Sequence, residues 1–179
     1  DTLSNQVPGL FLRVYVLEKI YADPENPQSA ILGRKPISGS KVEITSSTNS
    51  ATQTLQTLEE GYAELEIEEN TDYQIKASND GFLSNQTQFN PLDVGLDLNQ
   101  PNRVFELEIV LEKIFEQQEI TLANVYYDLD KWDIRADAAP VLDDLADVLK
   151  LNSNISIELA SHTDCRGPDK YNQELSQKR

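Results

Sequence analysis

The chain has 179 residues, of which 31 are acidic and 15 are basic, so its formal net charge at pH 7 is −16. This length suits one large domain or two small ones, and a hydrophobic fraction of 39% is typical of a globular protein rather than a disordered one. The sequence contains no run of about 18 apolar residues, so it predicts no transmembrane helix. The acidic residues are spread along the chain without a basic stripe, which argues against nucleic acid as a partner.

The single histidine and the single cysteine limit the chemistry that the chain can perform. His162, Asp164 and Cys165 lie on one short loop. A nucleophilic cysteine needs a base that is held by a third group from elsewhere in the fold. Zinc needs three or four ligands, and the chain has no CxxC or HxxxH spacing. We therefore predict no enzymatic activity, no metal site and no cofactor.

The first two thirds of the chain carry short segments in which polar and apolar residues alternate, as in half-buried strands. Turn-forming residues separate these segments, as at 23–27. Short strands at this spacing predict a β-sandwich for residues 1–116. The predicted strands are residues 10–17, 41–45, 62–68, 73–77 and 104–111.

One five-residue sequence, Val-Leu-Glu-Lys-Ile, occurs twice, at 16–20 and at 110–114. Two copies are too few for a solenoid, which needs three or more units at a fixed spacing. We interpret the copies as two similar strand ends, and an internal duplication is the alternative.

The pattern changes near residues 115–118. A strand over 120–127, a helix over 136–151 capped by Asp137, a strand over 155–159 and a helix from about 169 predict an α/β domain at residues 117–179. Pro140 fits this helix because it lies in the first turn. So short a piece buries little apolar surface and stops inside a helical pattern, so we expect the native polypeptide to continue beyond Arg179.

The loop at 160–168 leaves a predicted strand and enters a helix, and ligands bind at such places in open α/β sheets. Asn172, Ser176 and Arg179 share one face of that helix. Asp164 offers an anionic acceptor and Arg179 a rigid fork of donors, which together suit an amino-acid zwitterion. The other interpretation is an intramolecular salt bridge between Asp164 and Arg179, and the spacing alone favours the salt bridge.

Residues 119–179 resemble the first half of the OmpA C-terminal-like family, the peptidoglycan-binding domain shared with the peptidoglycan-associated lipoprotein. The resemblance rests on the sequences at 125–131, 138–143 and 157–164, followed by Gly167, 171–172 and 175–179, which occur in order and at the spacing of the family. It implies a non-catalytic protein of the periplasm, associated with the outer membrane, that binds peptidoglycan through the diaminopimelate of its stem peptide.

The resemblance also assigns site residues. The aspartate of the family falls on Asp164, its arginine on Arg179 and its helix asparagine on Asn172, while Thr163 and Asp128 match positions that line the same pocket. The chain departs from the family at Cys165, where small polar residues are common, and at Ser161, where glycine is frequent; neither change removes a charge from the pair.

Residues 10–114 resemble the carboxypeptidase regulatory-like, or transthyretin-like, β-sandwich. The resemblance rests on residues 35–44, on the turn before 61–62 and on 73–77 followed by 80–82. The predicted fold is therefore a transthyretin/Ig-like β-sandwich followed by an incomplete α/β OmpA-like domain. The sandwich family is mostly structural or interactive, and some envelope proteins, including components linked to type IX secretion, join both modules in this order. A protein-interaction scaffold of an outer-membrane or secretion complex is thus the alternative function.

Two further features have an ordinary and a functional interpretation. The acidic residues between 59 and 69 could bind calcium, but they alternate outward on a predicted strand and lack calcium-loop spacing, so we expect a solvated face. Trp132 could stack on a glycan, but a lone tryptophan beside a strand end is usually a core residue, and we expect the latter.

Overall fold

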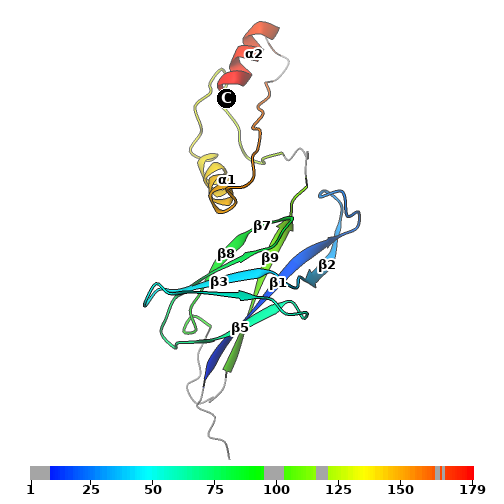
Figure 1. Ribbon diagram of the computed structural model, residues 1–179. Helices are drawn as coiled ribbons and strands as arrows, with labels where there is room; N and C mark the ends of the chain where they lie inside the picture. Colours follow the sequence, from blue (N-terminus) through cyan, green and yellow to red (C-terminus); the bar gives the residue numbers. More distant parts are fainter. Residues whose placement is uncertain (1–8, 95–102, 116–120, 164–165, 167) are drawn as a thin grey trace, which may run out of the picture. The chain divides into compact units, whose positions relative to one another are not determined.

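The computed structural model describes residues 9–94, 103–115, 121–163, 166 and 168–179. The chain divides into two compact units, Asp1–Glu116 and Gln117–Arg179. The first unit contains nine strands and the second contains two helices in the residues that the structure describes (Figure 1). No helix among these residues has the length and apolarity needed to cross a membrane.

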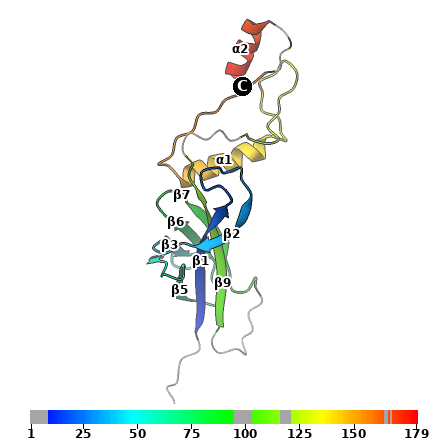
Figure 2. The same ribbon diagram turned by 90° about the vertical axis from the view of Figure 1, so that its right-hand side faces the viewer.

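One sheet of the first unit has five strands in the order β2-β1-β9-β7, and β5 also pairs with β1. The long strand β1 pairs with β2 along one half and with β5 along the other, both antiparallel. On its opposite edge β1 runs parallel to β9, and the two strands lie side by side in Figure 2. The strands are β1 (Leu10–Tyr21), β2 (Ile31–Pro36), β5 (Tyr62–Ile67), β7 (Phe82–Leu83) and β9 (Arg103–Lys113).

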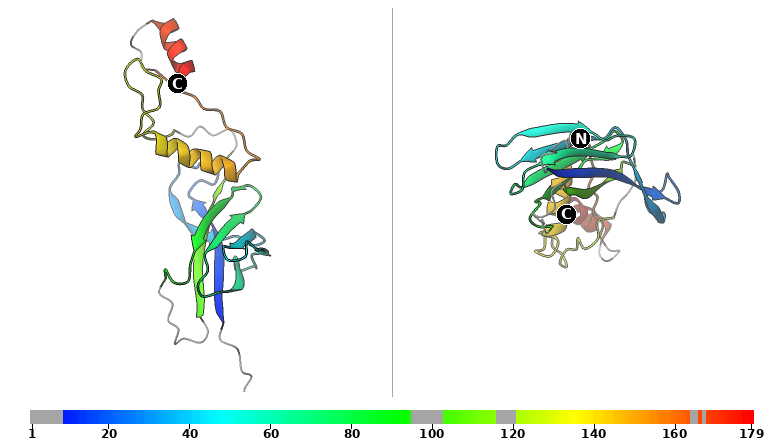
Figure 3. Two further views of the ribbon diagram at one scale, coloured as in Figure 1. Left: turned by 90° about the vertical axis from the view of Figure 1, so that its left-hand side faces the viewer. Right: turned by 90° about the horizontal axis from the view of Figure 1, so that it is seen from below.

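The second sheet has four antiparallel strands in the order β4-β3-β6-β8, and it forms the other layer of the sandwich (Figure 3, right). Its strands are β3 (Lys41–Ser46), β4 (Thr52–Gln56), β6 (Tyr73–Ser78) and β8 (Asn85–Phe89). The predicted β-sandwich is thereby confirmed. Strands β2, β4, β7 and β8 were not predicted. β2, β4 and β8 are short and largely polar or exposed, and β7 has only two residues.

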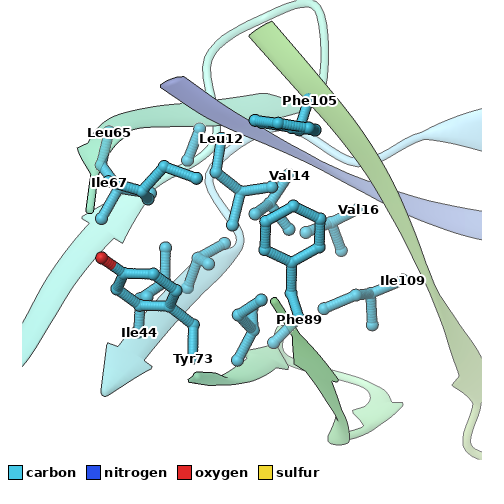
Figure 4. Close-up of a cluster of buried hydrophobic side chains, with 14 of the residues drawn as sticks. Leu12, Val14, Val16, Ile44, Leu65, Ile67, Tyr73, Phe89, Phe105 and Ile109 are labelled. Carbon is cyan, nitrogen blue, oxygen red and sulfur yellow. The ribbon is translucent and has the colours of Figure 1, made fainter. Parts of the chain in front are cut away.

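The core lies between the two sheets and is built by every second residue of the strands. Leu12, Val14 and Val16 of β1 are fully buried and face Ile44 of the second sheet (Figure 4), and Ile75 belongs to the same apolar cluster. This alternation is what the polar–apolar pattern predicts for strands with one wet face. The rings of Phe89 and Phe105 close the cluster in an edge-to-face contact with centroids 5.5 Å apart.

The few buried polar groups near the turns are all hydrogen-bonded. The hydroxyl of Thr57 accepts a hydrogen bond from the main-chain N–H of Ser40 (2.9 Å) and donates one to the main-chain oxygen of Ile37 (2.7 Å). The side-chain amide of Asn79 donates to the Ser40 hydroxyl (2.8 Å). Satisfied in this way, the groups do not carry the cost of an unpaired buried donor.

Gly61 occupies a position that no other residue fits. Its φ is +78°, and an added Cβ would lie 2.2 Å from the Cβ of Pro36. The turn is closed by hydrogen bonds from Gly61 N–H to the Leu58 oxygen and from Leu58 N–H to the Tyr62 oxygen, both 2.9 Å. A left-handed backbone and a close approach both require glycine here.

The repeated Val-Leu-Glu-Lys-Ile sequences lie on the adjacent parallel strands β1 and β9. They are not in register with each other, because Val16 lies opposite Ile109 and Leu17 opposite Val110, a stagger of one residue. The stagger brings Lys19 of one copy into an ion pair with Glu112 of the other. The copies are therefore two similar strand ends, as interpreted from the sequence.

In the second unit the two predicted helices are confirmed as α1 (Ala139–Leu151) and α2 (Asp169–Lys178). Pro140 sits in the first turn of α1, where its missing N–H costs nothing. The prediction that Asp137 caps this helix is wrong: Ala138 is the N-cap residue and no side chain caps it. The Asp137 carboxylate instead accepts two hydrogen bonds from Arg135, at 2.9 and 3.0 Å.

The predicted strands over 120–127 and 155–159 are absent from the described residues, which begin at 121 in the first case. Between α1 and α2, the described residues 155–163 form no strand and pair with none (Figure 3, left). An alternating segment becomes a strand only when a neighbour completes its ladder of hydrogen bonds. Ile157 and Leu159 accordingly remain exposed, at 46% and 67%.

Candidate functional site

The predicted site residues Arg179 and Asp128 come together, although they lie at opposite ends of the second unit. Arg179 follows α2, and Asp128 lies in the loop that precedes α1. The Nε of Arg179 donates a hydrogen bond to the main-chain oxygen of Lys131 (3.0 Å), and Nη2 donates one to the main-chain oxygen of Asp128 (3.4 Å). The guanidinium is thus fixed against the loop by one of its edges.

Tyr127 holds the same arginine in two further ways. Its ring centroid lies 4.9 Å from the guanidinium carbon of Arg179, which is the geometry of a cation–π contact. Its hydroxyl donates a hydrogen bond to the main-chain oxygen of Arg179 (2.9 Å). Side chain and main chain of Arg179 are therefore both anchored to the residue that precedes Asp128.

The carboxylate of Asp128 is paired with cations of its own loop. It accepts hydrogen bonds from Lys131 (3.2 Å) and from Arg135 (2.7 Å). The ammonium of Lys131 and then the guanidinium of Arg135 hold the pKa of Asp128 below its ordinary value. Asp128 thus contributes a charged carboxylate next to the site, and its main-chain oxygen is the group that touches Arg179.

Asn172 and Thr163 belong to the segment that leads into α2. Asn172 is half-buried, and its side-chain amide donates a hydrogen bond to the main-chain oxygen of Arg166 (3.0 Å), which ties the loop to the helix. Thr163 is half-buried, and within the described residues it makes no hydrogen bond to Arg179, Asn172 or Asp128. Asp164 and Cys165 lie outside the described residues.

Sequence reasoning missed Tyr127 and Lys131, which hold Arg179, and Arg135, which pairs with the carboxylate of Asp128. A signal was available, because aromatic and basic residues flank Asp128 within one short motif. Trp132, which we expected in the core, is instead 49% exposed. Among the described residues, no group of three or more His, Cys, Asp and Glu side chains could hold a metal ion.

A comparison with protein families decides what this region is. Residues 126–179 match the sequence model of the OmpA family. They form an OmpA family domain. The resemblance seen in the sequence of the second unit is thereby confirmed.

Curated relatives match the chain over 56 residues each. Outer membrane porin F of Pseudomonas fluorescens is 39% identical over 31% of this chain and 17% of its own length. Photosystem I P700 chlorophyll a apoprotein A2 of Gloeobacter violaceus is 38% identical over 31% of this chain and 6% of its own length. The chain thus spans only a small part of these relatives, and the similarity concerns one segment.

Solved structures resemble the chain at a lower level. GBS52, the minor pilin of Streptococcus agalactiae, has a TM-score of 0.40 at 12% identity, and the match covers 63% of this chain and 48% of the pilin chain. S.CueP has a TM-score of 0.36 at 14% identity, over 61% of this chain and 65% of its own. Similarities at this level assign no function, and the carboxypeptidase regulatory-like identity of the sandwich stays a prediction.

The family carries a general implication for this region. OmpA family domains are typically non-catalytic, and such a domain implies association with peptidoglycan in the cell envelope. The arrangement around Arg179 agrees with a binding role, because it fixes a donor group in place.

Proposed function

We propose that the second unit binds peptidoglycan non-covalently by recognising the diaminopimelate of the stem peptide. The observation that carries the proposal is the fixed guanidinium of Arg179, held beside Asp128 in a segment of the OmpA family. The free end of diaminopimelate has an ammonium and a carboxylate on one carbon. Arg179 would donate to the carboxylate, and Asp164 would accept from the ammonium.

The bonding of Arg179 leaves the correct edge for this task. A guanidinium has five N–H donors in a planar fork. Nε and Nη2 already donate to main-chain oxygens of the loop. Within the described residues Nη1 has no such partner, so the edge formed by Nη1 and Nη2 can meet a carboxylate with two parallel hydrogen bonds.

The remaining predicted residues would complete the pocket. Asn172 holds the main chain at Arg166 against α2, and Thr163 and Asp164 would contribute from the residues before it. Asp128 supplies a main-chain oxygen to Arg179 and a carboxylate whose charge is already balanced by Lys131 and Arg135. A charge balanced in this way does not compete with the ligand for Arg179.

We place the protein in the periplasm in association with the outer membrane. The OmpA family match and the similarity to a protein named outer membrane porin F support this location. Partners from the envelope or from type IX secretion stay predictions.

Retention on purified cell walls tests the proposal. In the protein, Asp164→Ala and Arg179→Ala should each lower the affinity for diaminopimelate-type walls by more than about a hundredfold, because losing one partner leaves the opposite charge of the ligand unpaired. Arg179→Lys should also weaken binding, since an ammonium cannot form the planar fork. Every variant, like the wild-type protein, should be retained poorly on lysine-type walls.

The chain offers matched controls on α1. Asp147 and Lys150 are exposed, form an ion pair with each other at 2.7 Å and lie outside the site. Asp147→Ala and Lys150→Ala make the same charge changes and should bind as the wild type does. Wild-type retention by folded Asp164→Ala and Arg179→Ala would overturn the proposal.

The second candidate function is a protein-interaction scaffold, and one feature of the sandwich favours it. On the outer face of the five-stranded sheet, the rings of Tyr15 and Tyr62 lie 5.4 Å apart, and the guanidinium of Arg13 lies 4.5 Å from the Tyr62 ring. Tyrosine and arginine are enriched where proteins dock. This function would take the place of peptidoglycan anchoring if the charge variants bound cell walls normally.

A further inference from the structure

Trp132 is exposed to an unusual degree for its residue type. Its relative exposure is 49%, whereas tryptophan is highly buried on average. It lies in the loop between Asp128 and α1 and is the only tryptophan of the chain. An exposed aromatic ring beside a binding site indicates a function more strongly than an exposed ring elsewhere on the surface does.

Two contacts join the segment of Trp132 to the end of α2 that carries Arg179. The main-chain oxygen of Lys131, the residue before Trp132, accepts the hydrogen bond from Arg179 Nε at 3.0 Å. The ammonium of Lys178, the residue before Arg179, lies 4.8 Å from the centroid of the Trp132 ring. The loop and the end of α2 therefore meet at two neighbouring pairs, Lys131 with Arg179 and Trp132 with Lys178. Trp132 follows Lys131 in the loop, and Lys178 precedes Arg179 on the helix.

The same contacts hold the ring in place. Lys178 covers part of the indole by a cation–π contact, which restrains the ring while about half of the residue stays exposed. Tyr171, about two turns before Lys178 on α2, donates a hydrogen bond from its hydroxyl to Asp130 (3.3 Å) and so ties the helix to the same loop. A ring restrained before binding loses little conformational entropy when a ligand covers it.

We propose that Trp132 is a stacking platform for a sugar ring of the peptidoglycan strand, adjoining the proposed diaminopimelate site. This inference rests on the proposed function, since it assigns the sugar and the peptide of one ligand to neighbouring parts of one surface. The C–H groups on the flat face of a pyranose carry partial positive charge and are apolar, so they pack on the negative face of an aromatic ring. The sugar hydroxyls meanwhile stay at the edge, in water or near Lys178.

The test compares two soluble ligands that differ only in the sugar. One is a stem tripeptide that ends in diaminopimelate, and the other is the same tripeptide on its disaccharide. Trp132→Leu should lower the affinity for the disaccharide-tripeptide by about tenfold, the size expected of one aromatic stack, and leave tripeptide affinity unchanged. Trp132→Phe, which keeps a ring, should recover part of the loss.

Tyr126→Leu is the matched control, because Tyr126 is an exposed aromatic residue of the same segment, at 66% exposure. It should leave both affinities unchanged. Because Trp132 is the only tryptophan, the fluorescence of the wild-type protein reports on it directly. The disaccharide-tripeptide should shift or quench the emission more than the tripeptide does.

The outcomes separate the inference from the proposed function. If Trp132→Leu weakens neither ligand, or weakens both equally, the platform is wrong, while tripeptide binding that is lost in Arg179→Ala still upholds the proposed function. If the wild-type protein binds neither ligand, the proposed function fails and the inference fails with it.

Discussion

The two units of the chain use the same alternating sequence patterns and reach very different degrees of burial. In the sandwich, alternate residues from both sheets enter one cluster in which every side chain is buried. In the second unit, only Ala138, Asn152 and Leu175 are buried among the described residues, and none of them lies in α1. Its exposed large apolar residues are Tyr126, Leu129, Trp132, Ile134, Val148, Ile157, Leu159 and Tyr171.

The difference shows that polar–apolar alternation identifies the apolar face of a segment. Whether that face is buried depends on a neighbouring element that packs against it. The sandwich is held by apolar packing between paired strands. The second unit is held at its ends by polar and cation–π contacts, in which Arg179 meets Tyr127 and Lys131. Order at the candidate site thus depends on a few specific side chains.

The same substitution in the two units gives the largest expected contrast. Ile75 is fully buried and Ile157 is 46% exposed. Ile75→Ala should lower the free energy of unfolding by about 2–5 kcal/mol, because it leaves a cavity in a packed core. Ile157→Ala should cost less than about 1 kcal/mol. Urea unfolding followed by far-ultraviolet circular dichroism measures both, and equal losses would contradict the contrast.

A second comparison stays within the sandwich and uses two glycines of similar backbone angle. Gly39 has a φ of +70° with nothing within 4 Å of an added Cβ, while Gly61 has a φ of +78° and a Cβ clash with Pro36. Gly39→Ala should cost about 1–2 kcal/mol of stability from backbone strain alone. Gly61→Ala should cost about 1–3 kcal/mol more, because the clash is added. Thermal unfolding of both variants checks the difference, which an equal effect would refute.

The smallest effect concerns the charges of the second unit. The pKa of Asp128 is lowered, first by Lys131 and then by Arg135, so the stabilisation from these pairs is present above the ordinary aspartate pKa and is lost as pH falls through the lowered value. Lys131→Ala and Arg135→Ala should each raise the pKa of Asp128, the former more. Carbon-detected NMR titration of the carboxyl group measures this, and an unchanged pKa in both variants would contradict the pairing.

The sequence predicted the strands that carry strong alternation, such as those containing Val42 and Ile75, because their core faces are unambiguous. It did not predict β2, where Ile31 and Leu32 are adjacent and exposed, or β4, which is almost entirely polar. Such edge strands are specified by the neighbour with which they pair rather than by their own pattern. The contact between Tyr127 and Arg179 could not be predicted, because 51 residues separate them and no sequence pattern indicates which loop packs against which helix end.

The one-residue stagger between β1 and β9 has a consequence for the fidelity of folding and for association. Identical segments placed in register would set Glu18 beside Glu112 and Lys19 beside Lys113, and like charges on adjacent strands repel. The stagger replaces both repulsions by the attraction between Lys19 and Glu112. The same rule applies between molecules, because copies of this segment stacked in register would align glutamate with glutamate and lysine with lysine. The repeat therefore disfavours the in-register pairing of identical strands that is found in amyloid fibres.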